Sequence, residues 1–296
     1  MTKKSIFQAG FEESLNLEKD GFGQLQHAQH QKTARHFHQG RASWGFRIGS
    51  FLLALVFAVG LNFMLLVISI ALHADARTLK MPIAESSFLT AEVFLIGLFV
   101  WLLLIIIGKI GIRQHYLLPY RYNFHVFTTL IWFMLELDLL FADFLLPALS
   151  WWGVIAICIL LIVVAWRMLN AKLKYLRQLL HGEMAAPALQ DKIARIIVNY
   201  GAILLFAGLL AKMIAGDSAA EVSNSIKAFG FLLAWVMLNI ASMAAVIFTG
   251  LPYFLQAYYH WKYPEAYRQR AGKSPQDWYG KRFVRQRGEL SENGST

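Results

Sequence analysis

Charged residues are scarce in this chain of 296 residues: they make up 16% of it, whereas hydrophobic residues make up 57%. Soluble globular domains usually carry about a quarter charged residues. Several apolar runs also reach the ~20 residues that a helix needs to cross the hydrocarbon core of a bilayer. The composition therefore excludes an ordinary soluble protein and predicts an all-α, polytopic membrane protein.

Cysteine is almost absent, because the chain holds only Cys158, which lies within an apolar run. A single thiol excludes an internal disulfide and a multi-cysteine metal site. The sequence also lacks the HExxH and Gly-x-Ser-x-Gly signatures of hydrolases, and Gly272-Lys273-Ser274 lacks the preceding glycine of a phosphate loop. No cofactor is expected, and an enzyme is the least favoured class of function.

Six apolar runs are long enough to cross a membrane. Lipid offers the backbone no hydrogen-bond partners, so runs of this length are expected to be helices. The predicted spans cover residues 47–72, 88–108, 124–146, 151–169, 196–214 and 228–248, within a bundle that extends over residues 47–254. An N-terminal tail of residues 1–46 and a C-terminal tail of residues 255–296 flank this bundle, and each tail is expected to contain an amphipathic helix.

Lysine and arginine are distributed unevenly between the predicted links. The two tails and the links after the second and fourth spans hold 24 of the 28 basic residues. The other three links hold only Arg77, Lys80, Lys212 and Lys227. Because basic loops stay in the cytoplasm, this alternation predicts a plasma-membrane protein with both termini in the cytoplasm. It also accounts for the net charge of +10 without nucleic-acid binding.

The predicted third span contains the segment WFMLELDLLFADF, residues 132–144, with three acids among apolar residues. An ionised acid at mid-bilayer costs at least ~2.5 kcal/mol, so acids there need a partner or a function. At 100° per residue, one face of this helix carries a polar stripe: His125, Thr129, Trp132, Glu136 and Asp143. Asp138 lies about 200° from Glu136 and points elsewhere.

Two interpretations of this stripe remain open. Either it forms an ion or proton path with Glu136 as its titrating group, or it is a polar seam that fixes the packing of helices. A less suitable alternative places residues 136–143 outside the membrane, which would put Pro119 and Arg121 inside a span. Possible partners within the bundle are Asn62, Asn239, Glu92 and Lys212, although Lys212 could instead extend to the outer surface.

The two tails carry different signals. The N-terminal tail holds four histidines, His27, His30, His36 and His38, which are weak candidates for a metal site because no complete ligand pattern accompanies them.

In the C-terminal tail aromatic residues alternate with Lys and Arg, which suits contact with anionic lipid head groups better than with nucleic acid. Ser274-Pro275-Gln276-Asp277 predicts the start of a short helix, over about residues 275–287.

Function is therefore narrowed to two main classes. The first is a transport component, either a small permease or the membrane subunit of a larger transporter that docks a cytosolic ATPase. The second is a non-catalytic scaffold, regulator or accessory subunit of an envelope complex. The six spans and the polar stripe favour the first class, whereas the prominent basic tails favour the second.

Overall fold

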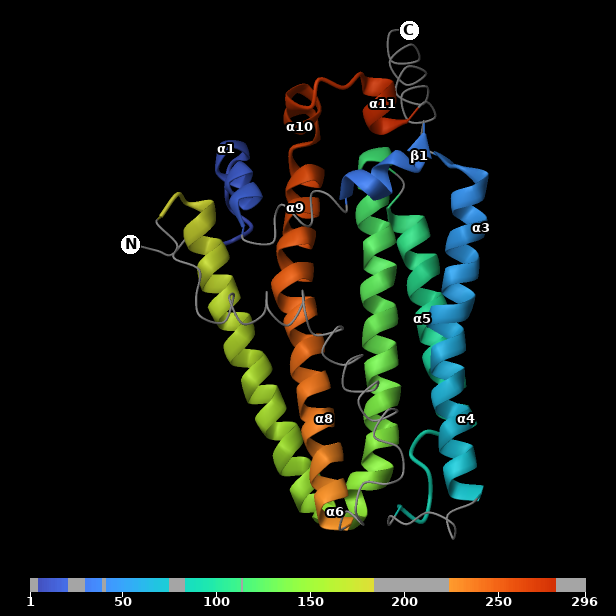
Figure 1. Cartoon of the computed structure of the whole chain (residues 1–296). Coiled ribbons are helices and arrows are strands. Elements are labelled where there is room, and N and C mark those ends of the chain that lie inside the picture. Colours follow the sequence, from blue (N-terminus) through green and yellow to red (C-terminus); the bar gives the residue numbers. More distant parts are fainter. Residues whose placement is uncertain are drawn as a thin grey trace, which may run out of the picture.

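The computed structural model describes residues 5–20, 30–38, 41–74, 83–112, 114–183 and 224–280. Within these ranges the chain is almost entirely helical, as predicted, and the long helices run side by side as a bundle (Figure 1). One end of the bundle carries residues 5–20 together with α9–α11, and is named the tail end. The opposite end, where α6 reverses direction, is named the hairpin end.

The elements follow the chain in this order. Near the start lie α1 (Phe11–Ser14), the 3-10 helix η1 (Leu15–Lys19), a helical turn at residues 30–35, and the paired strands β1 (Phe37–His38) and β2 (Arg41–Ala42). The bundle contains α3 (Trp44–Leu53), the π-helix η2 (Ala54–Gly60), α4 (Leu61–Ala74), α5 (Ala91–Gly111), η3 (His115–Leu117) and α6 (Leu118–Leu180). The last described elements are α8 (Asn224–Ala244), the π-helix η5 (Ala245–Gly250), α9 (Leu251–Lys262), α10 (Pro264–Arg270) and α11 (Pro275–Tyr279).

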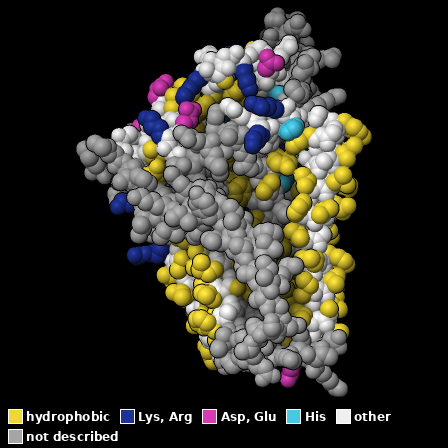
Figure 2. All heavy atoms as spheres, in the orientation of Figure 1, with side chains coloured by type: hydrophobic (Ala, Val, Ile, Leu, Met, Phe, Trp, Pro, Cys, Tyr) yellow, Lys and Arg dark blue, Asp and Glu magenta, His cyan; other side chains and the backbone are white. Residues whose placement is uncertain are grey.

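Four helical stretches are long and apolar enough to cross a membrane: Trp44–Ala74, Ala91–Gly111, His115–Leu180 and Leu232–Lys262. Large apolar side chains project from their flanks, including Ile96, Phe99 and Trp152, which are 63%, 67% and 81% exposed. Figure 2 shows these hydrophobic flanks and the charged side chains that gather towards the tail end. An apolar exterior of this extent is expected of helices that face lipid.

The third stretch, which contains α6, consists of two helical arms joined at Ser150. This residue has φ 59° and ψ 169°, which interrupts the helix and reverses its direction (Figure 1). Each arm exceeds the ~20 residues of a crossing, and the two arms contain the residues predicted as the third and fourth spans. The predicted fifth span, residues 196–214, lies outside the described residues.

The N-terminal segment, residues 5–20, packs against the second arm of α6 and against α9. Leu17 is fully buried beside Leu176 and Leu180 in a shared apolar cluster. The phenol of Tyr259 accepts the backbone N–H of Ala9 (3.2 Å), and Asn16 donates to the carbonyl of Leu180 (3.2 Å). The two tails are therefore joined in one packed unit, which we name the tail-end module: residues 5–20 and α9–α11.

A buried ion pair fixes this segment to α6. Lys172 Nζ lies 2.7 Å from Oδ1 of Asp20, and the two residues are 1% and 4% exposed. Lys172 shares its helix face with Tyr175 and Leu176, so the cation sits in the same surface that buries the N-terminal segment. Removing one partner of a buried pair leaves an uncompensated charge, which is strongly destabilising.

Replacement of Lys172 by Met should therefore release the N-terminal segment, because Asp20 would be left buried without its cation. We expect a loss of about 3 kcal/mol in the docking of the segment. Limited proteolysis of the purified chain should cut near residue 20 faster in Lys172→Met than in the parent. Lys174→Met, which removes an exposed lysine from the same helix, is the control. Equal cleavage of both variants would show that the pair does not hold the segment.

Candidate functional site

The first arm of α6 carries the three acids, and its helical geometry directs them to different neighbours. Glu136 and Asp143 are 2% and 0% exposed, whereas Asp138 is half-buried. Helix α4 and helix α5 pack against one side of this arm, and α8 packs against another side. The acids therefore lie between helices rather than on the exposed apolar surface of the bundle.

Asp143 organises the hairpin end between α4 and α5. Its Oδ1 accepts the backbone N–H of Phe88 (2.9 Å), and its Oδ2 lies 3.4 Å from the hydroxyls of Ser69 and Ser87. The backbone carbonyl of Asp143 accepts the N–H of Ala84 (2.8 Å), and His73 Nε2 lies 4.0 Å from Oδ2. These contacts tie residues 83–90 to α6, so Asp143 anchors the connection that leads into α5.

Glu136 has a single hydrogen-bond donor within the described residues. Trp132, one turn earlier, donates its indole N–H to Oε1 of Glu136 (2.6 Å). Oε2 is buried and has no hydrogen-bond partner in the described part of the chain. Apolar residues of α4, α5 and α6 enclose this position, among them Phe94 and Leu140. A buried carboxyl with one unsatisfied oxygen is a candidate proton-carrying group.

The rest of the polar stripe faces α5. Trp101 donates its indole N–H to the hydroxyl of Thr129 (3.1 Å), which itself donates to the carbonyl of His125 (2.9 Å). Two glycines allow this close approach: a Cβ on Gly108 would lie 3.0 Å from the His125 ring, and a Cβ on Gly97 would lie 2.3 Å from Nε1 of Trp132. The stripe therefore lies at a helix–helix contact.

Asp138 faces α8, away from the stripe, as helical spacing predicts. Its Oδ1 accepts the indole N–H of Trp235 (2.7 Å) and the amide of Asn239 (2.8 Å). A groove of about 310 Å³ runs beside these residues, lined mostly by apolar side chains such as Met134 and Val246. Asp138 thus connects two helices at the base of a largely apolar groove.

The residues that the sequence suggested as partners for the acids of α6 lie in different places. Asn239 bonds Asp138, whereas Asn62 is fully buried in α4 and donates to the carbonyl of Ala58 (2.6 Å). Glu92 is exposed in the first turn of α5, where a carboxylate suits the helix dipole. Lys212, the predicted ion-pair partner of Glu92 or Asp143, lies outside the described residues.

The two described histidine rings of the N-terminal tail face different aromatic partners. His30 packs on Tyr120 with ring centroids 4.7 Å apart, and His36 stacks on Phe46 at 4.5 Å. His27 and the side chain of His38 lie outside the described residues. Within the described ranges, no group of three or more His, Cys, Asp or Glu residues could hold a metal ion.

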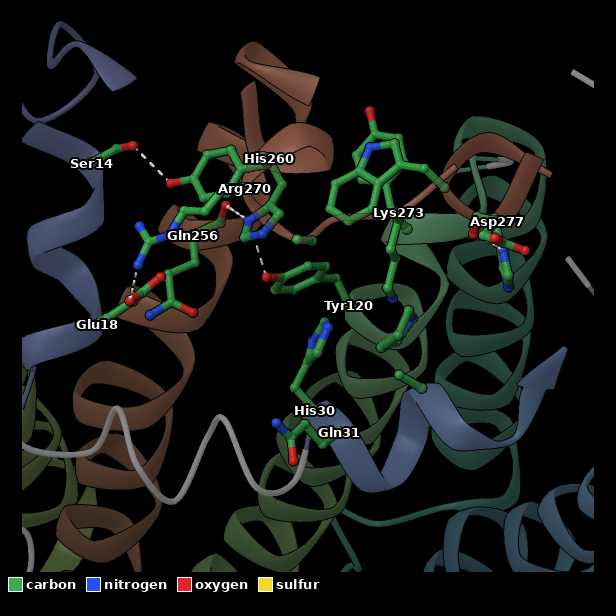
Figure 3. A pocket seen from close by; sticks show the side chains of 17 residues that line it. Ser14, Glu18, His30, Gln31, Tyr120, Gln256, His260, Arg270, Lys273 and Asp277 are labelled. Atoms are coloured by element: carbon green, nitrogen blue, oxygen red, sulfur yellow. Dashed lines mark hydrogen bonds and ion pairs between the residues drawn. The ribbon is translucent and has the colours of Figure 1, made fainter. Parts of the chain in front are cut away.

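A cavity of about 680 Å³ lies at the tail end (Figure 3), and sequence reasoning did not anticipate it. Its walls come from both tails and from the start of α6. The lining residues are Ser14, Glu18, His30, Gln31, Ala34, His115, Tyr116, Pro119, Tyr120, Gln256, His260, Tyr267, Arg270, Ala271, Lys273, Asp277 and Trp278. This volume lies within the range of small-molecule sites, about 300–1,000 Å³.

Stacked aromatic residues, two buried and two half-buried, give the cavity a fixed wall. The rings of His260 and Tyr267 stack with centroids 3.9 Å apart, and Tyr116 stacks on Trp278 at 5.0 Å. His260 Nδ1 lies 2.9 Å from the carbonyl of Gln256, which orients the ring. Burial raises the pKa of Tyr267, whose hydroxyl lies 2.7 Å from that of Ser14 and joins the two tails.

Helix α11, which contributes residues to the cavity wall, begins where Ser274-Pro275 predicts a helix start. Ser274 caps α11 by accepting the backbone N–H of Asp277 (3.2 Å), and Pro275 occupies the first helical position. The helix ends at Tyr279, because Gly280 adopts φ 88°, so it is shorter than the helix predicted over about residues 275–287. Residues 281–296, the rest of the C-terminal tail, lie outside the described residues.

Comparison with known proteins gives no match: no protein-family model, no curated protein and no solved structure resembles this chain significantly. The site is therefore interpreted from its own chemistry.

Gly97→Ala tests whether the α5 contact holds Trp132 on Glu136. The added methyl group would overlap the indole N–H, so Trp132 must move and its bond to Glu136 must weaken. We expect a loss of about 1–3 kcal/mol in stability, measured as lowered thermal stability in detergent. Gly49→Ala, where a Cβ would meet nothing within 4 Å, should be neutral or stabilising. Equal stability of the two variants would contradict this packing.

Proposed function

We propose that this chain is a multi-pass plasma-membrane protein that serves as a non-catalytic accessory or regulatory subunit of a membrane complex. The observation that carries the proposal is the tail-end module. A membrane anchor requires only apolar helices, whereas this module orders both tails around an aromatic core and a cavity. Ordered structure of this kind supports a binding role beyond anchoring.

The proposed orientation places the tail end in the cytosol. The uneven distribution of Lys and Arg supports it, since the basic links and both tails belong to one side of the membrane. The described charged side chains also gather towards this end of the bundle (Figure 2). Exposed cations there would contact anionic lipid head groups.

An exposed aromatic patch on the tail-end module supports a protein partner. Phe7 and Trp261 are 51% and 59% exposed, and Tyr258 lies between them, with ring centroids 5.2 Å from Phe7 and 6.2 Å from Trp261. Aromatic residues are enriched where proteins meet. A cytosolic partner, such as an ATPase subunit, would use this patch, and no nucleic acid is involved.

The double variant Phe7→Ala/Trp261→Ala should lose that partner, because both exposed rings of the patch would be removed. The tagged full chain is purified from its native membranes, and co-purifying proteins are quantified by mass spectrometry. We expect one partner in near-equal amount with the parent chain and about tenfold less with the double variant. Trp152→Ala, which alters an exposed ring at the hairpin end, should retain it. Recovery without a stoichiometric partner, or equal recovery by both variants, would contradict the proposal.

A second candidate, a transport component, is favoured by one observation. Oε2 of Glu136 is buried near the middle of its helical arm without a partner among the described residues, and ionisable groups in such positions often carry protons or ions. In this role Glu136 would release and rebind a proton during each transport cycle, while Trp132 holds the carboxyl in place.

Glu136→Gln separates transport from packing. Glutamine keeps an oxygen that can accept the Trp132 N–H, but it cannot titrate. In liposomes loaded with a pH-sensitive dye, we expect proton-coupled flux per folded chain to fall about tenfold or more. Glu92→Gln, at the exposed start of α5, should leave flux unchanged. If the parent shows no flux, or if Glu136→Gln retains it, the carboxyl does not serve transport.

A further inference from the structure

We propose that the tail-end cavity binds a phosphate-bearing ligand, which displaces the carboxylate of Glu18 from Arg270. The phosphate could belong to a soluble nucleotide or to a phospholipid head group, and the experiment below distinguishes these sources. The inference rests on the cavity itself and does not require the accessory role proposed above.

The cavity already holds an anionic group next to its cations. Nη2 of Arg270 lies 2.9 Å from Oε2 of Glu18, and both side chains line the cavity (Figure 3). The two side chains are 43% and 55% exposed, so water screens this ion pair and weakens it. A phosphate offers more charge and more acceptor oxygens than a carboxylate, and it suits the planar guanidinium group in two-point contact.

Lys273 supplies a second cation to the same cavity. Its Nζ lies 5.8 Å from the ring centre of Trp278, so the ammonium group is placed over an aromatic wall. The other acid in the lining, Asp277, accepts the hydroxyl of Ser274 (2.6 Å) at the start of α11. Once Glu18 is displaced, the described lining has two cations, Arg270 and Lys273, and one carboxylate, Asp277, so its balance of charge favours an anion.

A buried donor provides an independent indication of a ligand. Trp278 is 6% exposed and lines the cavity, yet its indole N–H has no hydrogen-bond partner within the described residues. Most buried donors in proteins are satisfied, so an unpaired one beside a cavity indicates an acceptor that binds there. A phosphate oxygen, or a polar atom attached to it, would be such an acceptor.

The aromatic wall indicates what accompanies the phosphate. Tyr116, Tyr120, His260 and Tyr267 are held in place by stacking and hydrogen bonds, so their faces are pre-organised. The volume of about 680 Å³ accommodates more than an inorganic anion. The ligand class is therefore a phosphate ester whose organic part packs on rings: a nucleobase and sugar, or the glycerol region of a lipid.

Binding is measured on the full chain in neutral detergent by isothermal titration, with ADP in one arm and short-chain phosphatidic acid in the other. We expect at least one probe to bind and its affinity to fall about tenfold or more in Arg270→Gln and in Lys273→Gln. Trp278→Phe, which keeps an aromatic ring but removes the indole N–H, should also weaken binding. The arm that responds identifies the source of the phosphate.

Glu18→Gln should change the affinity for the probe in the opposite direction. Because the proposed ligand competes with this carboxylate, affinity should rise by about threefold in Glu18→Gln. Lys19→Gln and Glu12→Gln change charge on the same segment at exposed positions outside the cavity, so both should bind as the parent does. Absence of binding by both probes would overturn the proposal, as would equal losses in Arg270→Gln and Lys19→Gln, or unchanged affinity in Glu18→Gln.

Discussion

The structure depends on one constraint: polar groups buried between long apolar helices must find their hydrogen bonds within the protein. The first arm of α6 meets this constraint with donors from its neighbours. Asp143 accepts the backbone N–H of Phe88, and Asp138 accepts the side chains of Trp235 and Asn239. Each acid thereby fixes the position of another element, so the acids that look misplaced in the sequence set how α4, α5 and α8 pack around α6. Glu136 differs, because one of its oxygens is left without such a partner in the described residues.

Much of the bundle could be predicted because its signals are local. The length of each apolar run indicates a helix, and the reversal at Ser150 lies in the short link, residues 147–150, between the predicted third and fourth spans. Helical spacing also separated Asp138 from Glu136. The identities of the partners could not be predicted in this way. Tryptophan counts as apolar in a hydropathy pattern, yet Trp132 and Trp235 act through their indole N–H groups, and which helix meets which depends on packing that no single helix encodes.

The tail-end module was harder to predict, since its contacts join residues far apart in the chain. The Ser14–Tyr267 hydrogen bond spans 253 residues, and neither partner belongs to a motif. The polar composition of the first residues indicates solvent exposure, but Leu17 and Asp20 are buried against α6. Only the C-terminal part carried a local signal, the Ser274-Pro275 start of α11, because capping depends on adjacent residues.

The joining of the two tails has a consequence for synthesis. Residues 5–20 are made before the elements that bury them, and two of the rings that hold them, Tyr259 and Tyr267, are made only after the described bundle helices α3–α8. Chains grow at about 5–20 residues per second, so this segment waits for roughly a quarter of a minute or longer before its binding surface is complete. During that interval Leu17 lacks the α9 side chains, Leu255 and Tyr259, that help to bury it. Completion of the tail-end module therefore requires the last described helices, and a chain truncated before α9 would retain only the α6 part of the surface that buries its N-terminal segment.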